Sequence, residues 1–163
     1  LHFVKSSATF AGVRNAYDEP QRLGVDRWLA LLAIEARGQN SAVIIDVGTA
    51  CTIDVLENGQ HLGGYIFPGM ALARDALVAN TDKIRFIENP EPSTSLGTDT
   101  ASCVLSGIWL TLLASCQSVI DRFPNATVYL TGGSARELMA LGLNAQRVDG
   151  LVFDGLDFWL NGA

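Results

Sequence analysis

A carboxylate followed at once by a glycine turn stands at residues 46–52, where the chain reads DVGTACT. Glycine lets backbone N–H groups approach an anion closely, and the Thr49 and Thr52 hydroxyls add donors for phosphate oxygens. A Walker-type loop would need Gly-Lys-Ser/Thr opening a helix, and this stretch has no lysine. Two interpretations stay open: a phosphate-binding turn between two strands, or a tight turn in which Asp46 accepts a hydrogen bond from its own backbone.

A second carboxylate, Asp26, stands beside Arg27 where residues 24–28 read GVDRW, at the start of a run of helix-forming residues. Arg27 can grip a carboxylate through two parallel hydrogen bonds, or merely neutralise Asp26 or another surface acid. Local chemistry alone favours Asp26 as a helix N-cap, because Asp there pairs with a free backbone N–H and suits the helix dipole.

Two glycine pairs complete the candidate chemistry. Gly63 and Gly64 lie in a strand-like segment and indicate either a bulge with close approach of a ligand, or packing against a neighbouring element. His61 lies at the exit of the same predicted hairpin, where we expect it to be exposed. The pair at 132–133 precedes a helical pattern and can lie against a nucleotide base or phosphate, although such a pair is weak evidence by itself.

The hydrophobic pattern indicates which elements position these groups. Residues 26–37 predict a buried helix stopped by Gly38, and 42–47 predict a strand covered on both faces. The Asn-Gly pair at 58–59 predicts a hairpin between strands at 51–56 and 61–67. Further along we expect a helix at 70–78, a mobile loop at 89–97, a helix capped by Asp99 or Thr100 and ended near 123, a strand at 127–131, a helix at 134–141, and a short strand and a terminal helix within 145–163. Residues 1–22 read as a loop around a short extended piece.

This order predicts an α/β fold with a mixed sheet, in which a three-stranded antiparallel meander is flanked by helices. It differs from the strict alternation of strand and helix in a dinucleotide-binding fold. With 163 residues, 48% hydrophobic and 17% charged, the chain fits one compact domain, residues 1–163.

Charge and cysteine content exclude several classes of function. The net charge is −6 and the 11 Lys and Arg residues are scattered, so we expect no nucleic-acid partner. The longest apolar runs fall short of the roughly 18 residues of a membrane span, and no signal peptide is visible, so we expect no membrane and a cytoplasmic location. Cys51, Cys103 and Cys116 lack a C-x-x-C spacing and are expected to be reduced thiols in the core.

Taken in order, these segments resemble the type III pantothenate kinases, members of the actin, sugar-kinase and heat-shock ATPase superfamily, and the resemblance implies the actin-like (ribonuclease H-like) ATPase fold. Residues 11–17 (AGVRNAY) and 21–28 (QRLGVDRW) resemble the family's Tyr and Gly-x-Asp-Arg substrate motifs. Residues 46–50 resemble its second phosphate motif, 63–69 (GGYIFPG) its Gly-Gly-x-Ile-x-Pro-Gly segment, and 130–133 (LTGG) its nucleotide-side strand and turn.

The resemblance implies ATP-dependent phosphorylation of pantothenate to 4′-phosphopantothenate, the first step of coenzyme A biosynthesis, with Mg²⁺ and a monovalent cation, K⁺ or NH₄⁺, as cofactors. Asp26 would accept the proton of the substrate hydroxyl, and Asp46 would bind the monovalent cation. Pantothenate would be held by Tyr17, Gly24, Val25, Asp26 and Arg27, and by Thr100 across the interface of a homodimer. ATP would contact Gly48, Thr49, Gly132 and Gly133.

One departure from the family is that its first motif, Asp-x-Gly-Asn-Thr, which binds phosphate and positions magnesium, does not occur here. The chain opens without methionine, so we expect it to be the C-terminal portion of a two-domain kinase, with 1–22 ending the inter-domain segment, and to be inactive alone. Two alternatives stay open: a non-catalytic relative acting as a regulatory accessory factor, and another superfamily sugar kinase or phosphatase.

Overall fold

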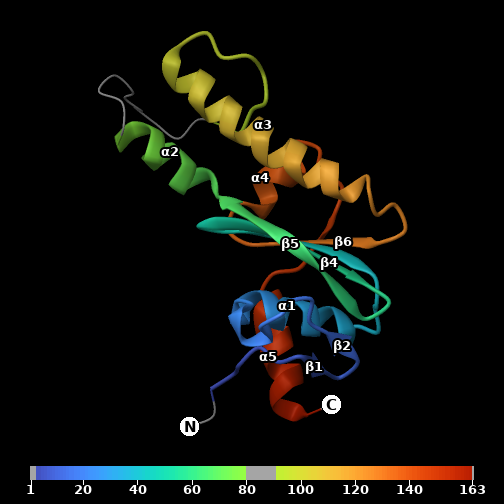
Figure 1. Cartoon of the computed structure of the whole chain (residues 1–163). Coiled ribbons are helices and arrows are strands. Elements are labelled where there is room, and N and C mark those ends of the chain that lie inside the picture. The colour runs from blue at the N-terminus through green and yellow to red at the C-terminus, as the bar shows by residue number, and fades with distance from the viewer. Residues whose placement is uncertain (1–2, 80–90, 163) are drawn as a thin grey trace.

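The computed structural model describes residues 3–79 and 91–162, and the strands found there form one seven-stranded mixed sheet in the order β1-β2-β5-β4-β3-β6-β7 (Figure 1). The strands are Thr9–Phe10 (β1), Val13–Arg14 (β2), Ala42–Val47 (β3), Ala50–Glu57 (β4), Gln60–Pro68 (β5), Thr127–Thr131 (β6) and Gln146–Arg147 (β7). The predicted meander is confirmed, because β3, β4 and β5 pair antiparallel in sequence. β6 runs parallel to β3, β7 parallel to β6 and β2 parallel to β5.

The central strand β3 carries apolar side chains on both faces, as its sequence predicts. Val43, Ile45 and Val47 enter one buried cluster, while Ala42 and Ile44 enter the other. Successive side chains of a strand point to opposite faces, so an unbroken apolar strand needs cover on both sides. Two cores, one on each face of the sheet, are the result.

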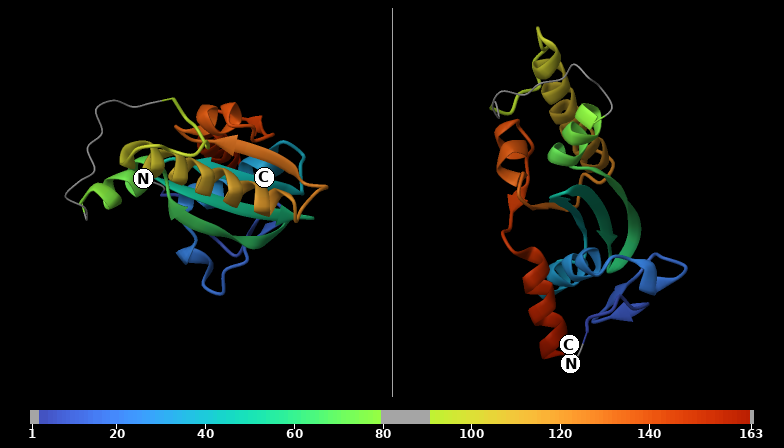
Figure 2. Two further views of the ribbon diagram at one scale, coloured as in Figure 1. Left: turned by 90° about the horizontal axis from the view of Figure 1, so that it is seen from above. Right: turned by 90° about the vertical axis from the view of Figure 1, so that its left-hand side faces the viewer.

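Helices supply that cover in two layers. They are Val25–Ala36 (α1), Met70–Ala79 (α2), Thr100–Ile120 (α3), Ala135–Ala140 (α4) and Leu151–Asn161 (α5). α1 and α5 pack together on one face of the sheet, and α3 and α4 cover the other (Figures 1 and 2). The three layers confirm the α/β prediction, and each predicted helix in the described residues is present.

Two local predictions are confirmed by backbone geometry. Asn58 and Gly59 have φ of 51° and 74°, so both central residues of the hairpin turn take the positive values that such turns require. Asp99 caps α3: its carboxylate accepts from the Ser102 N–H at 3.0 Å, and the Ser102 hydroxyl accepts from the Asp99 N–H in return.

The first segment and the loop before α3 contain little regular structure. Residues 1–22 were expected to form a loop around an extended piece, and they contain the small β1–β2 hairpin and a 3-10 turn, Pro20–Arg22. Of the loop predicted at 89–97, residues 89 and 90 lie outside the described residues, while 91–97 contain no helix or strand.

The structure corrects one prediction about the cysteines and adds a feature of α3. Cys51 and Cys116 are buried, as expected, but Cys103 is exposed near the start of α3 and is not a core residue. Within the described chain, α3 is long and apolar enough to cross a membrane by those two criteria alone, although core helices of soluble proteins meet them too. Only 33% of its most apolar window is buried, and its exposed positions carry Leu110 among small and polar residues such as Thr111, Ala114 and Ser118.

Candidate active site

Three strands end at the same edge of the sheet, and each is followed by a glycine turn. β3, β5 and β6 run in one direction, so the turns at Gly48, Gly69 and Gly132 meet at their carboxyl ends. The Gly69 N–H donates to the Thr49 carbonyl at 2.9 Å, and the Ser134 N–H donates to the Val47 carbonyl at 3.0 Å. The fold therefore assembles the predicted phosphate-side segments, 46–50 and 132–133, into one surface.

Glycine is required in two of these turns because the chains approach so closely. A Cβ at Gly69 would lie 2.1 Å from the Gly48 carbonyl oxygen, and one at Gly132 would lie 2.5 Å from Asp46 Oδ1. Real Cβ contacts essentially never fall below 3.0 Å. Bare backbone at this edge is the kind of surface that lets N–H groups reach an anion.

Asp46 lies half-buried at the end of β3. Within 3–79 and 91–162 no hydrogen bond reaches its carboxylate, and the Gly48 N–H donates instead to the Ala50 carbonyl at 2.9 Å. The turn in which Asp46 would accept from its own backbone is therefore not formed. Burial, and then the negative charge of Asp26, raise the pKa of Asp46. The negative charge of Asp26 thus acts on Asp46. A cation bound beside Asp46 would offset both the loss of hydration and this repulsion, and would favour the ionised form of Asp46.

Asp26 lies at the start of α1, on an exposed position, but it is not the N-cap. Gly24 occupies the N-cap, and Asp26 is the second residue of the helix, where its Oδ1 accepts from the Arg27 N–H at 2.9 Å. The prediction of a cap was wrong by two positions. A side chain at Gly24 would meet Asp26 Oδ1 at 2.6 Å, so the glycine keeps the space around this carboxylate open.

Arg27 reaches the sheet and is buried. Its Nε donates to Asp54 Oδ2 at 2.7 Å and its Nη2 to Asp54 Oδ1 at 2.5 Å, which makes the fork-to-fork pair of strong ion pairs. Its Nη1 donates to the Tyr17 hydroxyl at 2.9 Å. Burial alone would lower the pKa of Arg27, but the hydrogen bonds and charge of Asp54, with Tyr17, outweigh it and leave that pKa raised. Of the options for Arg27, the grip on a carboxylate through two parallel hydrogen bonds is the one observed, and the carboxylate is that of the buried Asp54.

His61, expected to be exposed, is completely buried, and this prediction was wrong. Its Nε2 lies 2.8 Å from Asp54 Oδ1, and its Nδ1 faces the Ala16 N–H at 3.4 Å. Neither Asp54 nor His61 was singled out as functional from the sequence. Asp54 carried a usable signal, since a charged residue inside the apolar strand 51–56 is almost never buried without a partner.

The glycine pair in β5 has two separate explanations. The β4–β5 register shifts beside Leu62, and Gly63 has φ of +114°, which is the predicted bulge. Gly64 faces the ion pair, because a Cβ there would lie 2.6 Å from Asp54 Oδ1 and 2.8 Å from Arg27 Nη2. Packing against a neighbouring element explains Gly64.

Thr100 is the one predicted site residue that the fold keeps apart from the others. It is the exposed first residue of α3, on the opposite side of the sheet from α1 (Figures 1 and 2). Within a single chain, therefore, Thr100 and Asp26 do not share a site.

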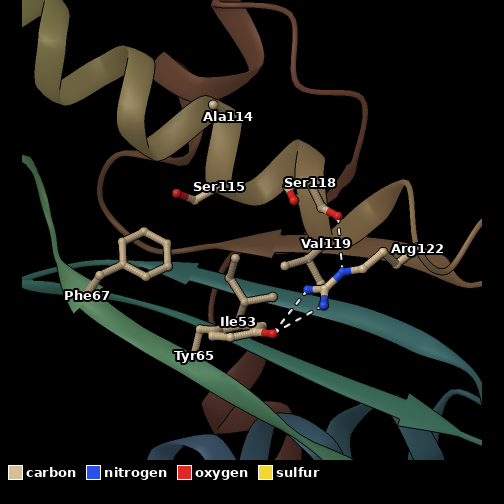
Figure 3. A pocket seen from close by; sticks show the side chains of 8 residues that line it. All are labelled: Ile53, Tyr65, Phe67, Ala114, Ser115, Ser118, Val119 and Arg122. Carbon is tan, nitrogen blue, oxygen red and sulfur yellow. Dashed lines mark hydrogen bonds between the residues drawn. The ribbon is translucent and has the colours of Figure 1, made fainter.

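Two cavities lie along α3, on the face away from Asp26. One, of about 550 Å³, is bounded by β4, β5 and α3, and Figure 3 shows Arg122 reaching across it to the Tyr65 hydroxyl at 3.2 Å. The other, of about 570 Å³, is a mainly apolar groove between α2, the end of β5 and α3. None of the predicted site residues lines either one.

Comparison with known proteins decides the family. A model of the type III pantothenate kinases matches residues 1–122. A type III pantothenate kinase of Marinobacter nauticus is 40% identical over 161 residues, covering 96% of this chain and 66% of the relative. The chain belongs to this family. Another type III pantothenate kinase, from Acinetobacter baumannii, is 40% identical over 134 residues, covering 82% of this chain and 54% of the relative. The chain thus spans between about half and two thirds of these curated relatives.

Solved structures agree on the fold. A conserved putative Baf family transcriptional activator from Campylobacter jejuni matches with a TM-score of 0.63 and 26% identity, covering 84% of this chain and 63% of that one. A putative 2-dehydro-3-deoxygalactonokinase from Sinorhizobium meliloti matches with a TM-score of 0.52 and 17% identity, covering 80% and 56%, and shows the fold alone. The predicted actin-like ATPase fold is confirmed.

Proposed function

We propose that the protein containing this chain phosphorylates pantothenate with ATP to give 4′-phosphopantothenate. The observation that carries the proposal is that the exposed Asp26 carboxylate lies within electrostatic reach of Asp46, at an edge where glycine turns bring bare backbone together. Phosphoryl transfer depends mainly on positioning and on neutralising charge, which such an edge can supply. Membership of the type III pantothenate kinase family supports pantothenate as the alcohol that is phosphorylated.

In this mechanism Asp26 orients the primary hydroxyl of pantothenate and accepts its proton as the oxygen attacks the γ-phosphorus of ATP. A carboxylate within hydrogen-bond reach of the hydroxyl is a suitable general base for this step. Gly24 and Val25 would border the pantothenate at the start of α1, and Tyr17 and Arg27, joined by a hydrogen bond of 2.9 Å, would hold it from the side of the sheet. Gly48, Thr49, Gly132 and Gly133 lie along the phosphates, where backbone N–H groups and the Thr49 hydroxyl can donate.

Asp46 fits a cation ligand, because it is a half-buried carboxylate without a hydrogen-bond donor among the described residues. We assign it to the monovalent cation of the family, K⁺ or NH₄⁺, while Mg²⁺ would accompany ATP. These cations supply positive charge against the phosphates. No group of three or more acidic, His or Cys side chains suited to a metal occurs in the described part of the chain, so water, carbonyl and phosphate oxygens would complete their shells.

The test uses the full-length protein and couples ADP release to NADH oxidation, with and without pantothenate. Asp26→Asn should lower kcat by about 10²- to 10⁴-fold, the usual contribution of a positioned base, with a smaller effect on KM. Asp157→Asn, an exposed acid on α5, is the matched control and should behave as wild type. Full activity in Asp26→Asn would refute the base assignment. If pantothenate does not increase ADP release by the wild type, an accessory role is favoured instead. If sugars increase ADP release, another kinase of the superfamily is favoured.

The proposal includes residues 1–163 as the C-terminal domain of a two-domain kinase that works in the cytoplasm, where its ATP is. It also includes a homodimer with the substrate site at the interface. Thr100 lies across the sheet from α1 in its own chain, so it can contact substrate only in a second copy. The exposed side of α3, which carries Leu110, and the apolar groove beside it give that copy a surface to bury.

Size-exclusion chromatography with light scattering tests the dimer. Leu110 is 52% exposed on α3, and Leu110→Glu should shift the mass from dimer to monomer because a charge cannot be buried there without a partner. Leu160, 60% exposed on α5, provides the control, since Leu160→Glu leaves the α3 face intact. A wild-type monomer, or a Leu110→Glu dimer, would contradict this part of the proposal.

A further inference from the structure

Behind the start of α1 lies a buried polar network built from four separate segments. Arg27 of α1 and Asp54 of β4 have side chains 6% and 4% exposed, and His61 of β5 is fully buried. Tyr17, from the loop after β2, closes the network by accepting from Arg27 Nη1 at 2.9 Å. Arg27 is the next residue after Asp26, so the network is anchored to the first turn of α1.

The stability of the fold does not by itself explain why this network is present. A buried ion pair loses so much hydration that apolar residues of similar volume often serve a fold as well or better. What an ion pair does provide is direction, because the guanidinium fork admits one orientation against a carboxylate. β5 also leaves room for it, since a side chain at Gly64 would collide with both Asp54 and Arg27.

His61 is held so firmly that its hydrogen-bonding state follows from its neighbours. Because its Nδ1 faces the Ala16 N–H, that nitrogen acts as the acceptor, and Nε2 carries the hydrogen donated to Asp54 Oδ1. The ring stacks on Tyr17 with centroids 6.3 Å apart and an interplanar angle of 15°. His61 therefore supports both the Asp54 carboxylate and the Tyr17 ring.

The N–H groups of Arg27 that the network does not use suggest a role in binding a ligand. A guanidinium has five N–H donors. Asp54 takes the one on Nε and one on Nη2, and Tyr17 takes one on Nη1. One N–H remains on each terminal nitrogen. Since Asp54 cancels the charge of Arg27, these two act as directed hydrogen-bond donors rather than as a free positive charge.

We propose that Asp54 and His61 are positioning residues, which hold the Arg27 guanidinium and the Tyr17 ring so that they align pantothenate on Asp26. The inference rests on the proposed function and deepens it, because it names the residues that set substrate alignment. Neither touches the substrate; both act through Arg27 and Tyr17. The consequence is a defect confined to pantothenate when either is replaced, with ATP handled normally.

The experiment measures kcat and the KM values for pantothenate and ATP in the full-length protein. Asp54→Asn keeps the shape but loses a charge and an acceptor, and it should raise the pantothenate KM by about tenfold or more, since a misplacement of about 1 Å can cost roughly 10²-fold. The ATP KM should stay within about twofold of wild type. Arg37→Gln, which breaks the Arg37–Asp154 pair at the other end of α1, is the matched control and should leave both KM values unchanged.

A pair of substitutions at His61 separates positioning from mere packing. In His61→Gln the amide N–H₂ can replace the Nε2–H donor to Asp54, whereas His61→Phe fills the space without any donor. We expect His61→Gln to keep the pantothenate KM close to the wild-type value, and His61→Phe to raise it as Asp54→Asn does. If Asp54→Asn does not fold, as checked by circular dichroism, the His61 pair decides the question.

Three results overturn the inference: a normal pantothenate KM in the folded variants, equal losses for pantothenate and ATP, or identical behaviour of His61→Gln and His61→Phe. Each presupposes a wild type that phosphorylates pantothenate. A wild type that releases no ADP with pantothenate refutes the proposed function itself, so the two failures are distinguishable.

Discussion

The adjacent glycines at the end of β6 provide a sharp test, because one tolerates a side chain and the other does not. Gly132 has φ of +96°, and a Cβ there would lie 2.5 Å from Asp46 Oδ1 and 2.6 Å from the backbone N and C of Val47. Gly133 has no atom within 4 Å of its would-be Cβ, and its φ lies outside the left-handed region. Gly132→Ala and Gly133→Ala therefore add the same methyl group in opposite circumstances.

The size of the effect follows from two costs. An L-residue held at positive φ costs about 1–2 kcal/mol. Forcing a carbon into a packed site costs about 1–3 kcal/mol more, here because backbone atoms of Val47 must move. Gly132→Ala should therefore lower the free energy of unfolding by about 2–5 kcal/mol. Gly133→Ala should raise it by about 0.4–1 kcal/mol, since alanine restricts the unfolded chain.

Urea unfolding of the full-length protein, followed by tryptophan fluorescence, measures both variants. With a slope of about 2 kcal/mol per M, Gly132→Ala should lower the midpoint by about 1–2.5 M, and Gly133→Ala should raise it by less than about 0.5 M. Equal midpoints for the two variants would show that β6 does not press its turn against Asp46 and Val47. The geometry of the proposed phosphate edge would then be wrong.

Three further predictions concern stability. The folded protein raises the pKa of Asp46, so ionised Asp46 lowers the stability of the fold; this loss is fully present above the raised pKa and absent below the ordinary value of 3.8. Asp46→Asn should therefore raise the urea midpoint at pH 7, and this gain should disappear as the pH falls toward 3.8. A gain that stays the same across this pH range would contradict the prediction. Leu112, 1% exposed, and Leu110, 52% exposed, lie on one helix, so Leu112→Ala should cost about 3–5 kcal/mol, and Leu110→Ala less than about 0.5 kcal/mol in the monomer, by urea unfolding. Asp99→Ala removes the carboxylate half of the capping box on α3, while the bond from the backbone N–H of residue 99 to the Ser102 hydroxyl can remain, and it should cost about 1 kcal/mol by the same measurement, with Asp121→Ala, at the other end of α3, as the comparison.

Much of the fold could be predicted because its signals are local. The β-branched run at 42–47, the Asn-Gly turn at 58–59 and the helical spacing after Asp99 each act within a few residues, and each element is observed. The candidate site segments were found in the same way, as carboxylates and glycines at element ends. Their convergence at one edge follows from the parallel directions of β3, β5 and β6.

The errors concern residues whose environment depends on distant parts of the chain. His61 was expected outside because it adjoins a hairpin, yet β4 and the loop at Ala16 enclose it. Cys103 was expected inside because it is apolar, yet its position on α3 faces outward. Asp26 was taken for a cap because Asp commonly caps helices, but Gly24 already begins this one.

The sequence by itself determined the order of elements, the positions of the tight turns and the family, because these depend on residue types and spacings along the chain. Only the tertiary structure decided which charged groups meet. Asp54 lies 27 residues from Arg27 in sequence and binds it directly, while Asp26 and Asp46 act on each other across the sheet edge. The physical reason is that a buried charge is stable only beside a suitable partner, and the packing of helices on the sheet selects that partner.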